Sequence, residues 1–276
     1  MSKTKKIMVL ICGIIIIIFC TSIIYKNKEE SAVKPQKNWT LVWNDEFNGE
    51  NGSAVDNLKW VQEIGGNGWG NNEDQYYTEG TNNCYIQNEN LVIEAKKEEH
   101  EKSKYTSARI KTNGKFDFKY GKVEMKAKLP SGQGIWPAFW MLGSDFETAG
   151  WPDCGEIDIM ENVGKTPKTV NGTAHAPGYS GNMGLGSFLT IEEDLSSAYH
   201  IYSIEWSEDK IEWLMDDKKY HSLTPQTIGG NKWAFNKEFF LLLNLAVGGN
   251  WPGYPNDTTI FPQKYYIDYV HVYQLR

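Results

Sequence analysis

The chain has 276 residues, a formal net charge of −7 and an aromatic content of 13%, including 11 Trp. This length is enough for one large domain, and the negative charge, with no basic stripe in the body, argues against nucleic acid as a partner. Aromatic rings in such number suit sugars, whose C–H faces pack on rings while their hydroxyls need polar partners.

An apolar run follows a short positive flank at the N-terminus. The first six residues include three Lys, and residues 7–25 are mostly apolar. This pattern predicts a signal peptide or a membrane anchor over residues 1–25, because the run reaches the lower edge of the roughly 17–25 residues that span a bilayer. No small-residue cleavage site follows cleanly, which favours an uncleaved anchor but leaves cleavage open. Either outcome exports the body, secreted or anchored at the outer face of the cell membrane, and restricts membrane contact to this segment.

Residues 26–38 are charged and polar and contain Pro35, which predicts a flexible linker. The folded body is therefore expected over residues 39–276, as one domain.

Short apolar or alternating runs, separated by Gly and Pro, predict strands throughout this body. The expected strands cover residues 41–43, 91–95, 108–112, 121–129, 199–206, 210–215, 239–247 and 265–273. Helical periodicity is nearly absent, with at most a turn or two at residues 191–197. The pattern predicts an all-β fold, an antiparallel β-sandwich or jelly roll, whose concave sheet would form an open groove for a polymer.

Cys84 and Cys154 are the only cysteines outside the N-terminal apolar run. No disulfide framework or Cys/His cluster surrounds them. Two buried free thiols are therefore favoured over one disulfide, and a zinc site is not expected.

Three carboxylates cluster in the sequence Gly-Glu-Ile-Asp-Ile-Met-Glu at residues 155–161. In a strand, Glu156 and Asp158 point to the same side, whereas Glu161 comes one residue late for that face. A β-bulge at Ile159–Met160 would absorb the extra residue and return Glu161 to the face. Acids that alternate with apolar residues are also typical of an ordinary half-solvated strand. Three gathered carboxylates repel one another, however, which favours acid/base and nucleophilic chemistry.

Aromatic and polar residues before and after these acids are candidates for the walls of a groove. Each stretch alone is more typical of core packing or a turn, and the three acids make the groove the better interpretation. His175 could hydrogen-bond the acids or a sugar hydroxyl, although a lone His is more often structural. Arg109 lies inside a predicted strand, where its charge needs a carboxylate or a bound sugar as partner. The candidate substrate-binding residues are Asn71, Glu73, Arg109, Trp136, Trp140, Trp151, His175 and Trp251.

The acidic strand resembles the signature of glycoside hydrolase family 16, and six further segments agree with that family in order. They begin at Trp43 (WNDEFNG), Gly70 (GNNE), Tyr120 (YGKVE), Gly134 (GIWPAFWML), Asn244 (NLAVGGNWPG) and Ile267 (IDYVHVY). The resemblance covers residues 39–276 and is strongest to bacterial laminarinases, which are endo-1,3-β-glucanases. It implies a concanavalin A-like β-jelly roll with an open substrate cleft and a retaining mechanism.

The same resemblance assigns Glu156 as nucleophile, Glu161 as general acid/base and Asp158 as an assisting residue between them. Family members that resemble lichenases and xyloglucan transglycosylases lack the extra residue, so Met160 places the chain in the bulged group of laminarinases, agarases and carrageenases. His175 and the loop at residues 248–253 favour β-1,3-glucan, which leaves mixed-linkage glucan or agarose as alternatives. A non-catalytic β-glucan-binding protein is the alternative class, but such a protein is expected to lack one or both Glu.

The resemblance also implies one structural calcium ion, because many family members bind one away from the cleft. The matching positions are Glu46, Gly66 and Asp268, whose oxygen ligands suit calcium. The proposed chemistry itself needs no catalytic cofactor. A β-glucan is the expected partner, and the protein is expected to be a monomer.

Overall fold

The computed structural model describes residues 37–276. The predicted signal peptide or anchor, and most of the predicted linker, lie outside the described residues. Within residues 37–276, no helix is both long and apolar enough to cross a membrane. Residues Trp39–Arg276 form one compact unit, the range in which the folded body is expected.

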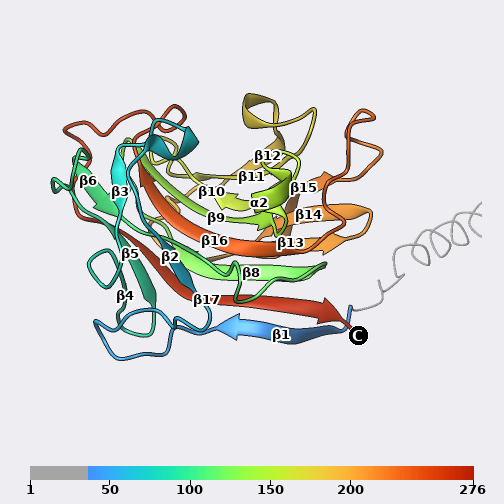
Figure 1. Cartoon of the computed structure of the whole chain (residues 1–276), viewed down its shortest axis with the longest axis horizontal. Coiled ribbons are helices and arrows are strands. Elements are labelled where there is room, and N and C mark those ends of the chain that lie inside the picture. The colour runs from blue at the N-terminus through green and yellow to red at the C-terminus, as the bar shows by residue number, and fades with distance from the viewer. Residues whose placement is uncertain (1–36) are drawn as a thin grey trace, which may run out of the picture. The chain divides into compact units, whose positions relative to one another are not determined.

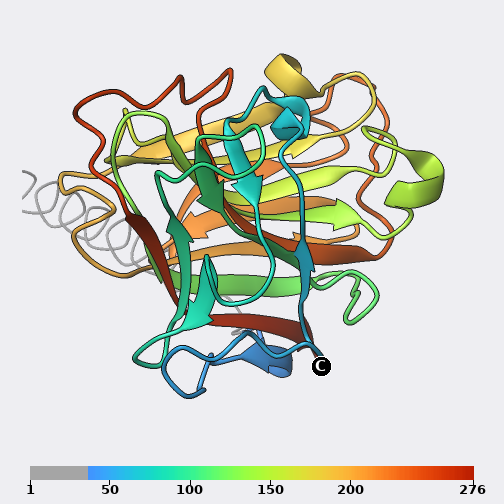
Figure 2. The same cartoon turned by 60° about the vertical axis from the view of Figure 1, so that its left-hand side comes forward.

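Two antiparallel sheets make up most of this unit (Figures 1 and 2). The seven-stranded sheet has the order β12 (Leu185–Thr190), β11 (Thr169–His175), β10 (Glu156–Glu161), β9 (Ile135–Gly143), β16 (Phe239–Val247), β7 (Arg109–Lys111) and β2 (Val61–Glu63). The eight-stranded sheet has the order β15 (Lys218–Leu223), β14 (Lys210–Met215), β13 (His200–Ser207), β8 (Gly121–Lys128), β17 (Gln263–Leu275), β5 (Leu91–Ala95) and β4 (Cys84–Ile86), and β1 (Trp39–Asp45) also pairs with β17. The smaller elements are the parallel pair β3 (Gln75–Tyr77) and β6 (Tyr105–Ser107), the helix α2 (Phe146–Ala149), and the 3-10 turns η1 (Gly68–Gly70) and η2 (Gly181–Met183). The all-β, antiparallel sandwich that the sequence predicts is confirmed.

The predicted strands correspond to observed ones, and β5, β14 and β16 agree with their predictions to the residue. Residues 191–197, where a helical turn was expected, form bends and turns without a helix. The four-residue helix α2 was not expected, because it is too short to show a helical period.

Strand β16 lies inside the seven-stranded sheet, and both of its faces are covered by apolar residues. All of its residues are buried, and it pairs with β9 on one side and β7 on the other. Its odd-numbered residues, such as Leu241 and Leu243, pack in the main core between the sheets. On the opposite face Phe240 and Leu242 form a second apolar cluster with Leu142 and Cys154. Apolar residues are therefore favoured on both faces of the strand, and Asn244 is the one polar residue in it.

Strand β8 shows the alternation that the sequence predicts, with one exception. Val123, Met125 and Ala127 face the core, while Lys122 and Lys126 are only partly buried on the other face. Glu124 belongs to that other face by register, yet its side chain is also buried.

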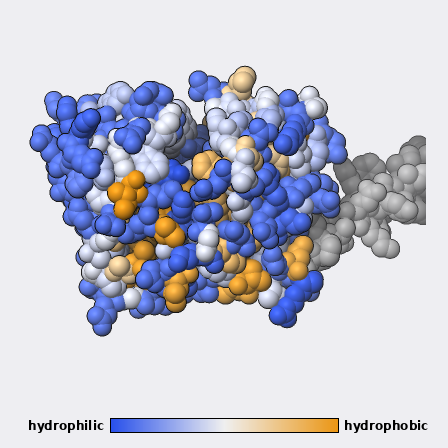
Figure 3. All heavy atoms as spheres, in the orientation of Figure 1, coloured by the Kyte–Doolittle hydropathy of each residue, from blue (hydrophilic) through white to orange (hydrophobic). Residues whose placement is uncertain are grey.

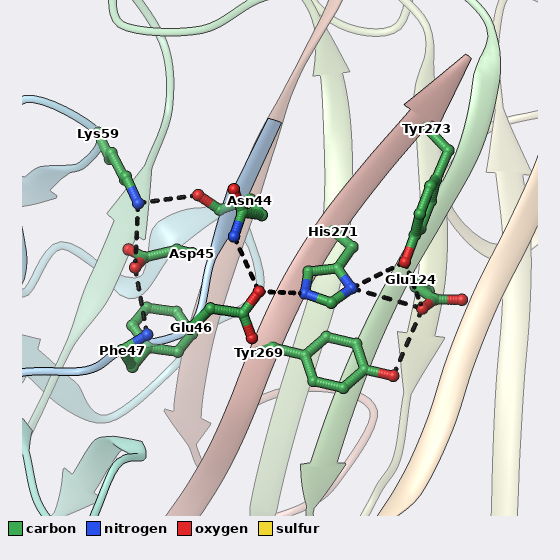
Figure 4. A network of polar contacts seen from close by, with 9 residues as sticks. All are labelled: Asn44, Asp45, Glu46, Phe47, Lys59, Glu124, Tyr269, His271 and Tyr273. Atoms are coloured by element: carbon green, nitrogen blue, oxygen red, sulfur yellow. Dashed lines mark hydrogen bonds and ion pairs between the residues drawn. The ribbon is translucent and has the colours of Figure 1, made fainter. Parts of the chain in front are cut away.

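The burial of Glu124 follows from a polar network over β8, β17 and the end of β1 (Figure 4). Tyr269 and Tyr273 both donate hydroxyl hydrogen bonds to Oε1 of Glu124, at 3.4 and 3.2 Å. His271 stacks on Tyr269, with ring centroids 3.9 Å apart, and its Nε2 lies 2.6 Å from Oε1 of Glu46. The network therefore fastens the chain after β1 to the C-terminal strand on the outer face of the eight-stranded sheet.

Cys84 and Cys154 are both buried and free, which confirms the favoured interpretation. Burial raises the pKa of the Cys84 thiol to about 12. Burial, followed by the nearby charge of Glu156, raises the pKa of Cys154 to about 11. Both thiols therefore remain protonated and unreactive near neutral pH.

Candidate active site

The predicted β-bulge lies in the middle of β10. The pairing of β10 with β9 shifts between Asp158 and Met160, and its pairing with β11 shifts between Asp158 and Glu161. Ile159 and Met160 are consecutive, and both are buried in the main core. A regular strand would send one of the two to the opposite face, so the bulge serves to bury both side chains and to return Glu161 to the face of Glu156 and Asp158.

The bulge is supported from the other sheet. The indole N–H of Trp213, which is fully buried in β14, donates a hydrogen bond of 2.8 Å to the backbone carbonyl of Asp158. This bond gives a partner to a carbonyl at the point where the ladder is interrupted, since a buried backbone group without one is costly.

The three carboxylates are enclosed rather than solvated. The side chains of Glu156 and Asp158 are 17% and 5% exposed, and Glu161 is 9% exposed as a residue. His175, directly opposite Glu156 on β11, places its Nε2 atom 3.1 Å from Oδ2 of Asp158 and 3.7 Å from Oε1 of Glu156. This geometry excludes the half-solvated strand that was the simpler interpretation of the sequence.

Enclosure shifts the ionisation of the acids. Burial, and then the charge of Asp158, raise the pKa of Glu156 to about 8, although His175, a hydrogen bond from Trp151 and the charge of Arg109 oppose the rise. Burial also raises the pKa of Asp158 to about 8, and a hydrogen bond with Glu156 opposes that rise.

The pKa of Glu161 is raised well above its usual range, first by burial and then by the charges of Asp158 and Glu156. A carboxylic acid that stays protonated while a neighbouring carboxylate ionises is the requirement for a general acid.

Two tryptophans hold Glu161 at the rim of the site. The indole N–H of Trp136 donates to Oε1 of Glu161 at 3.1 Å. Trp136 in turn meets Trp251 edge to face, with ring centroids 5.4 Å apart. Lys165 donates a 2.5 Å hydrogen bond to the backbone carbonyl of Trp251 and so fixes this loop. Of the four predicted tryptophans, the structure thus brings Trp136 to Glu161 and Trp251 to Trp136.

Arg109 lies on β7, which β9 and β16 separate from the acids of β10. With Trp69, Trp140 and Glu63 it forms a second arm of the site. Its guanidinium carbon lies 4.7 Å from the ring centre of Trp69 and 4.8 Å from that of Trp140. Its Nε donates to Glu63 at 2.5 Å, and Glu63 also accepts a hydrogen bond of 2.8 Å from Lys111. The predicted need of Arg109 for a carboxylate partner is therefore met within the protein.

Asn71 and Glu73 connect to this arm through a chain of hydrogen bonds. Glu73 is bonded to Gln75 at 2.6 Å, Tyr77 at 3.3 Å and Asn71 at 3.4 Å. From Tyr77 the chain continues through Asn244 to the indole of Trp140, at 3.2 and 2.7 Å. Despite these bonds, burial raises the pKa of Glu73 above its usual value.

Trp151 stands at the other end of the acidic row. It is 46% exposed, its ring centroid is 6.3 Å from that of His175, and it hydrogen-bonds Glu156. A partly exposed ring that contacts a buried acid is suited to pack on a sugar bound over that acid.

Sequence reasoning missed three residues of this site. Asn244 could have been found, because an amide inside the apolar run of β16 needs a buried partner. Trp69 lies in a segment already rich in site residues, at a backbone φ of 46°. Glu63 lies in the three-residue strand β2, whose sequence carries no signal of its role.

The structure does not gather the residues predicted to bind calcium through their side chains. The carboxylate of Asp268 pairs with Lys126 at 2.6 Å, and that of Glu46 bonds His271. Gly66 packs closely on Tyr76. Glu46 and Asp268 do lie on neighbouring segments, since Asp45 pairs with Val270, so a calcium site there would depend on backbone oxygens and on release of Lys126. It stays a prediction.

Among the described residues, one group of acids and histidines could hold a metal ion. It consists of Glu156, Asp158 and His175, whose ligand atoms lie within 4.8 Å of one another. A cation bound there would occupy the same carboxylates that the acid/base chemistry requires.

One edge of the molecular surface is hollowed. In Figure 3 the upper edge of the molecule is hollowed between two masses of mainly hydrophilic side chains, which correspond in Figure 1 to the segments that carry η1 and η2. Aromatic walls, few but convergent polar groups and shifted carboxyl groups are together typical of an active site for a carbohydrate.

Comparison with known proteins agrees with this geometry. The family described as glycosyl hydrolases family 16 matches residues 71–271. A beta-glucanase of Rhodothermus marinus is 39% identical over 283 residues, covering 99% of this chain and 96% of that protein. The catalytic domain of an endo-1,3-beta-glucanase (laminarinase) from Thermotoga petrophila superposes with a TM-score of 0.83 at 49% identity, covering 87% of this chain and 100% of that domain. A beta-1,3-glucan-binding protein of Penaeus monodon is 32% identical over 52% of this chain and 47% of its own length.

Proposed function

The chain belongs to glycosyl hydrolases family 16, and from the acidic row of β10 we propose that it cleaves β-1,3-glucan internally by a retaining double displacement. The protein is a glycoside hydrolase with the jelly-roll sandwich of the laminarinases. One observation carries the proposal: Glu156, Asp158 and Glu161 share one face of a bulged strand, enclosed and flanked by the indoles of Trp136 and Trp151.

In the first step, the carboxylate of Glu156 attacks the anomeric carbon and forms a covalent ester with the sugar. Glu161 donates its proton to the glycosidic oxygen, and the leaving sugar departs. In the second step, Glu161 takes a proton from water, the water oxygen attacks the anomeric carbon, and the ester bond to Glu156 breaks.

The neighbouring groups support these roles. Asp158 and His175 hold the nucleophile between them, and the pKa of Glu161 depends on the charge of Glu156. Once Glu156 has become an ester its charge is lost, so the pKa of Glu161 falls at the moment when it must act as a base.

The residues of the site and the names of the relatives distinguish the proposed function from its alternatives, a non-catalytic binding protein and a hydrolase of another polysaccharide. A β-glucan-binding protein without activity needs none of the three acids, yet all of them are enclosed and oriented here. The names of the relatives include several polysaccharides, and those of three relatives at 40%, 41% and 49% identity concern β-1,3-glucan. We therefore propose a laminarin-type substrate, with mixed-linkage 1,3-1,4-glucan as a further one.

The test replaces Glu156 or Glu161 by Gln and measures reducing ends released from laminarin. Each change is expected to lower turnover by at least about 1000-fold, because it removes a group that acts on the reacting atoms. Glu193→Gln, on the exposed turn before β13, is the matched control and should keep full activity. Near-normal turnover in either cleft variant refutes the mechanism, and cleavage of agarose but not laminarin refutes the substrate.

The N-terminal segment and the oligomeric state belong to the proposal as well. The positive flank and apolar run of residues 1–25 support export, as a secreted or anchored protein. The expected oligomeric state is a monomer. Cell fractionation with N-terminal sequencing of the mature protein would distinguish a cleaved signal peptide from an anchor, and sedimentation would give the mass.

A further inference from the structure

We propose that β11 and β12 carry a further sugar-binding subsite, in which Phe188 is the platform for a distal sugar residue of the same glucan chain. The inference rests on the proposed function, since it extends the cleft beyond the acids to the edge of the seven-stranded sheet.

The register of three strands places Phe188 on the cleft face. Glu161 on β10 lies opposite Asn171 on β11, and Asn171 lies opposite Phe188 on β12. Directly paired residues of antiparallel strands project to the same side of a sheet, so the three side chains form one row. Phe188 is therefore two strand spacings, or about 10 Å, from the strand of the acids.

The opposite face of these strands is accounted for independently. A Cβ added to Gly172, the next residue of β11, would lie 2.4 Å from the ring of Trp213 in the core between the sheets. Residues of β11 thus alternate between core and cleft, and Asn171 and Phe188 are on the cleft side. His175 on β11 pairs with Glu156 on β10, and their side chains are in contact. This second pair also shows that His175, Thr173 and Asn171 lie on the face of β11 that carries the acids.

Phe188 is unusually open for a large apolar side chain. It is 65% exposed, on a strand in which exposed and half-buried residues alternate. A single exposed apolar residue is common and has no meaning by itself. What carries the inference is its position, in line with Glu161 and at the edge of the same cleft face.

The cleft face beside Phe188 is kept low by two glycines that precede it along the chain. A Cβ on Gly184 would meet the His175 ring at 2.3 Å, and one on Gly186, which pairs with Thr173, would meet Oγ1 of Thr173 at 2.7 Å. Neither position can take a side chain without moving its neighbour, so the chain leading to Phe188 along β12 presents bare backbone at these positions of the cleft face. A polymer can lie flat over such a surface.

Polar groups surround the ring, as a sugar requires. The amide of Asn171 lies beside Phe188 in the row and donates to the backbone carbonyl of Glu161 at 3.3 Å. Further along the strands, the hydroxyls of Thr169 and Thr190 are exposed and 2.9 Å apart. An apolar platform with hydroxyl and amide neighbours matches the C–H face and the hydroxyl edge of a glucosyl residue.

The experiment compares a long and a short substrate. Phe188→Ala should raise the KM for laminarin by roughly 3- to 10-fold with little change in kcat, because the loss of one stacking partner weakens binding of the polymer. Phe188→Trp should restore the wild-type KM. An aryl glycoside of laminaribiose, too short to reach β12, should be hydrolysed at the same kcat/KM by all three proteins. Tyr199→Ala, which removes a partly exposed ring before β13 in the eight-stranded sheet, is the matched control and should leave both substrates unaffected.

Several results would overturn the subsite. They are an unchanged KM for laminarin in Phe188→Ala, an equal loss on the short substrate, the same effect from Tyr199→Ala, or a change in molecular mass that marks Phe188 as a subunit contact. Affinity electrophoresis in laminarin gels, in a Glu156→Gln background, separates this inference from the proposed function. Absence of retardation of Glu156→Gln itself contradicts the proposed substrate. Equal retardation of Glu156→Gln and Glu156→Gln/Phe188→Ala contradicts only the subsite.

Discussion

His175 occupies the position from which one side chain can influence two carboxylates at once. Its Nε2 atom lies 3.1 Å from Oδ2 of Asp158 and 3.7 Å from Oε1 of Glu156. The charge of His175 opposes the rise that burial imposes on the pKa of Glu156. It therefore keeps the proposed nucleophile ionised to a lower pH than burial alone would allow.

We predict that His175→Gln shifts the acidic limb of the pH profile of kcat/KM to higher pH. The pKa of Glu156 is already raised to about 8, and His175 opposes this rise. Replacing His175 removes that opposing interaction and raises the pKa of Glu156 further, so activity at neutral pH falls while activity at alkaline pH recovers. The measurement is kcat/KM on laminarin from pH 5 to 10. His100→Gln, an exposed His outside the cleft, is the control. An acidic limb that stays in place, with activity reduced equally at every pH, would show that His175 acts only through structure.

Single residues differ in how well the sequence predicts them. Glu156, Asp158 and Glu161 can be identified from the sequence, because three acids on one face of a strand are rare. The partners of Arg109 do not, because Glu63 is 46 residues away in the chain and reaches Arg109 only when β2 pairs with β7. Contacts between distant segments depend on the pairing of strands, which local patterns do not contain.

The bulge in β10 is the element on which the site depends. It lies where two apolar residues in succession must both enter the core, and Trp213 completes the hydrogen bonding of the interrupted ladder. The sequence predicts it because a one-residue slip of a strand moves every later side chain to the opposite face. The one-residue offset of Glu161 from a regular strand is thus a structural requirement.

We predict different outcomes for Met160→Ala and for deletion of Met160. Both remove a buried side chain, which should lower the free energy of unfolding by about 2–5 kcal/mol. The deletion alone also removes the extra residue and so displaces Glu161 relative to Asp158, which should lower kcat by about 100-fold more than the substitution does. Thermal unfolding and kcat on laminarin are the two measurements. Equal kcat values in the two variants would contradict a catalytic need for the bulge.

Elements of the sandwich were predictable in proportion to their length and burial. Strand β16 stands out in the sequence because both of its faces are covered, one by the core and one by the cluster of Phe240 and Leu242. Strands β2, β3, β4 and β6 have three residues each, too few to show a period. They exist because neighbouring strands offer them hydrogen bonds.

At the scale of the whole molecule, the eight-stranded sheet supports the sheet that carries the acids. Its outer face holds the network of Glu46, Glu124 and His271 (Figure 4). Hydrogen bonds from Asn44 and His271 outweigh burial and lower the pKa of Glu46. A lowered pKa in the folded state means that the stability from this contact is present above the usual pKa of a Glu and is lost as the pH falls through the lowered value.

We predict that calcium stabilises the whole molecule without taking part in the chemistry. An ion that binds only the folded protein raises the Tm by mass action, so added Ca²⁺ should raise the Tm, a chelator should lower it, and kcat should be unchanged in both. Asp268→Asn should abolish the shift, and Asp257→Asn, in an exposed loop, should keep it. A Tm that does not respond to Ca²⁺ would exclude the site.

The central claim is that Glu156 attacks the anomeric carbon and Glu161 supplies and recovers the proton, so that two inversions retain the configuration of the sugar. The most direct test follows the anomeric protons by NMR immediately after the enzyme is added to a β-1,3-gluco-oligosaccharide. The mechanism predicts that the first product to appear carries the β configuration at its new reducing end and converts to the α form only by slow mutarotation. First appearance of the α form would mean direct attack by water and would contradict the assignment of Glu156 as nucleophile.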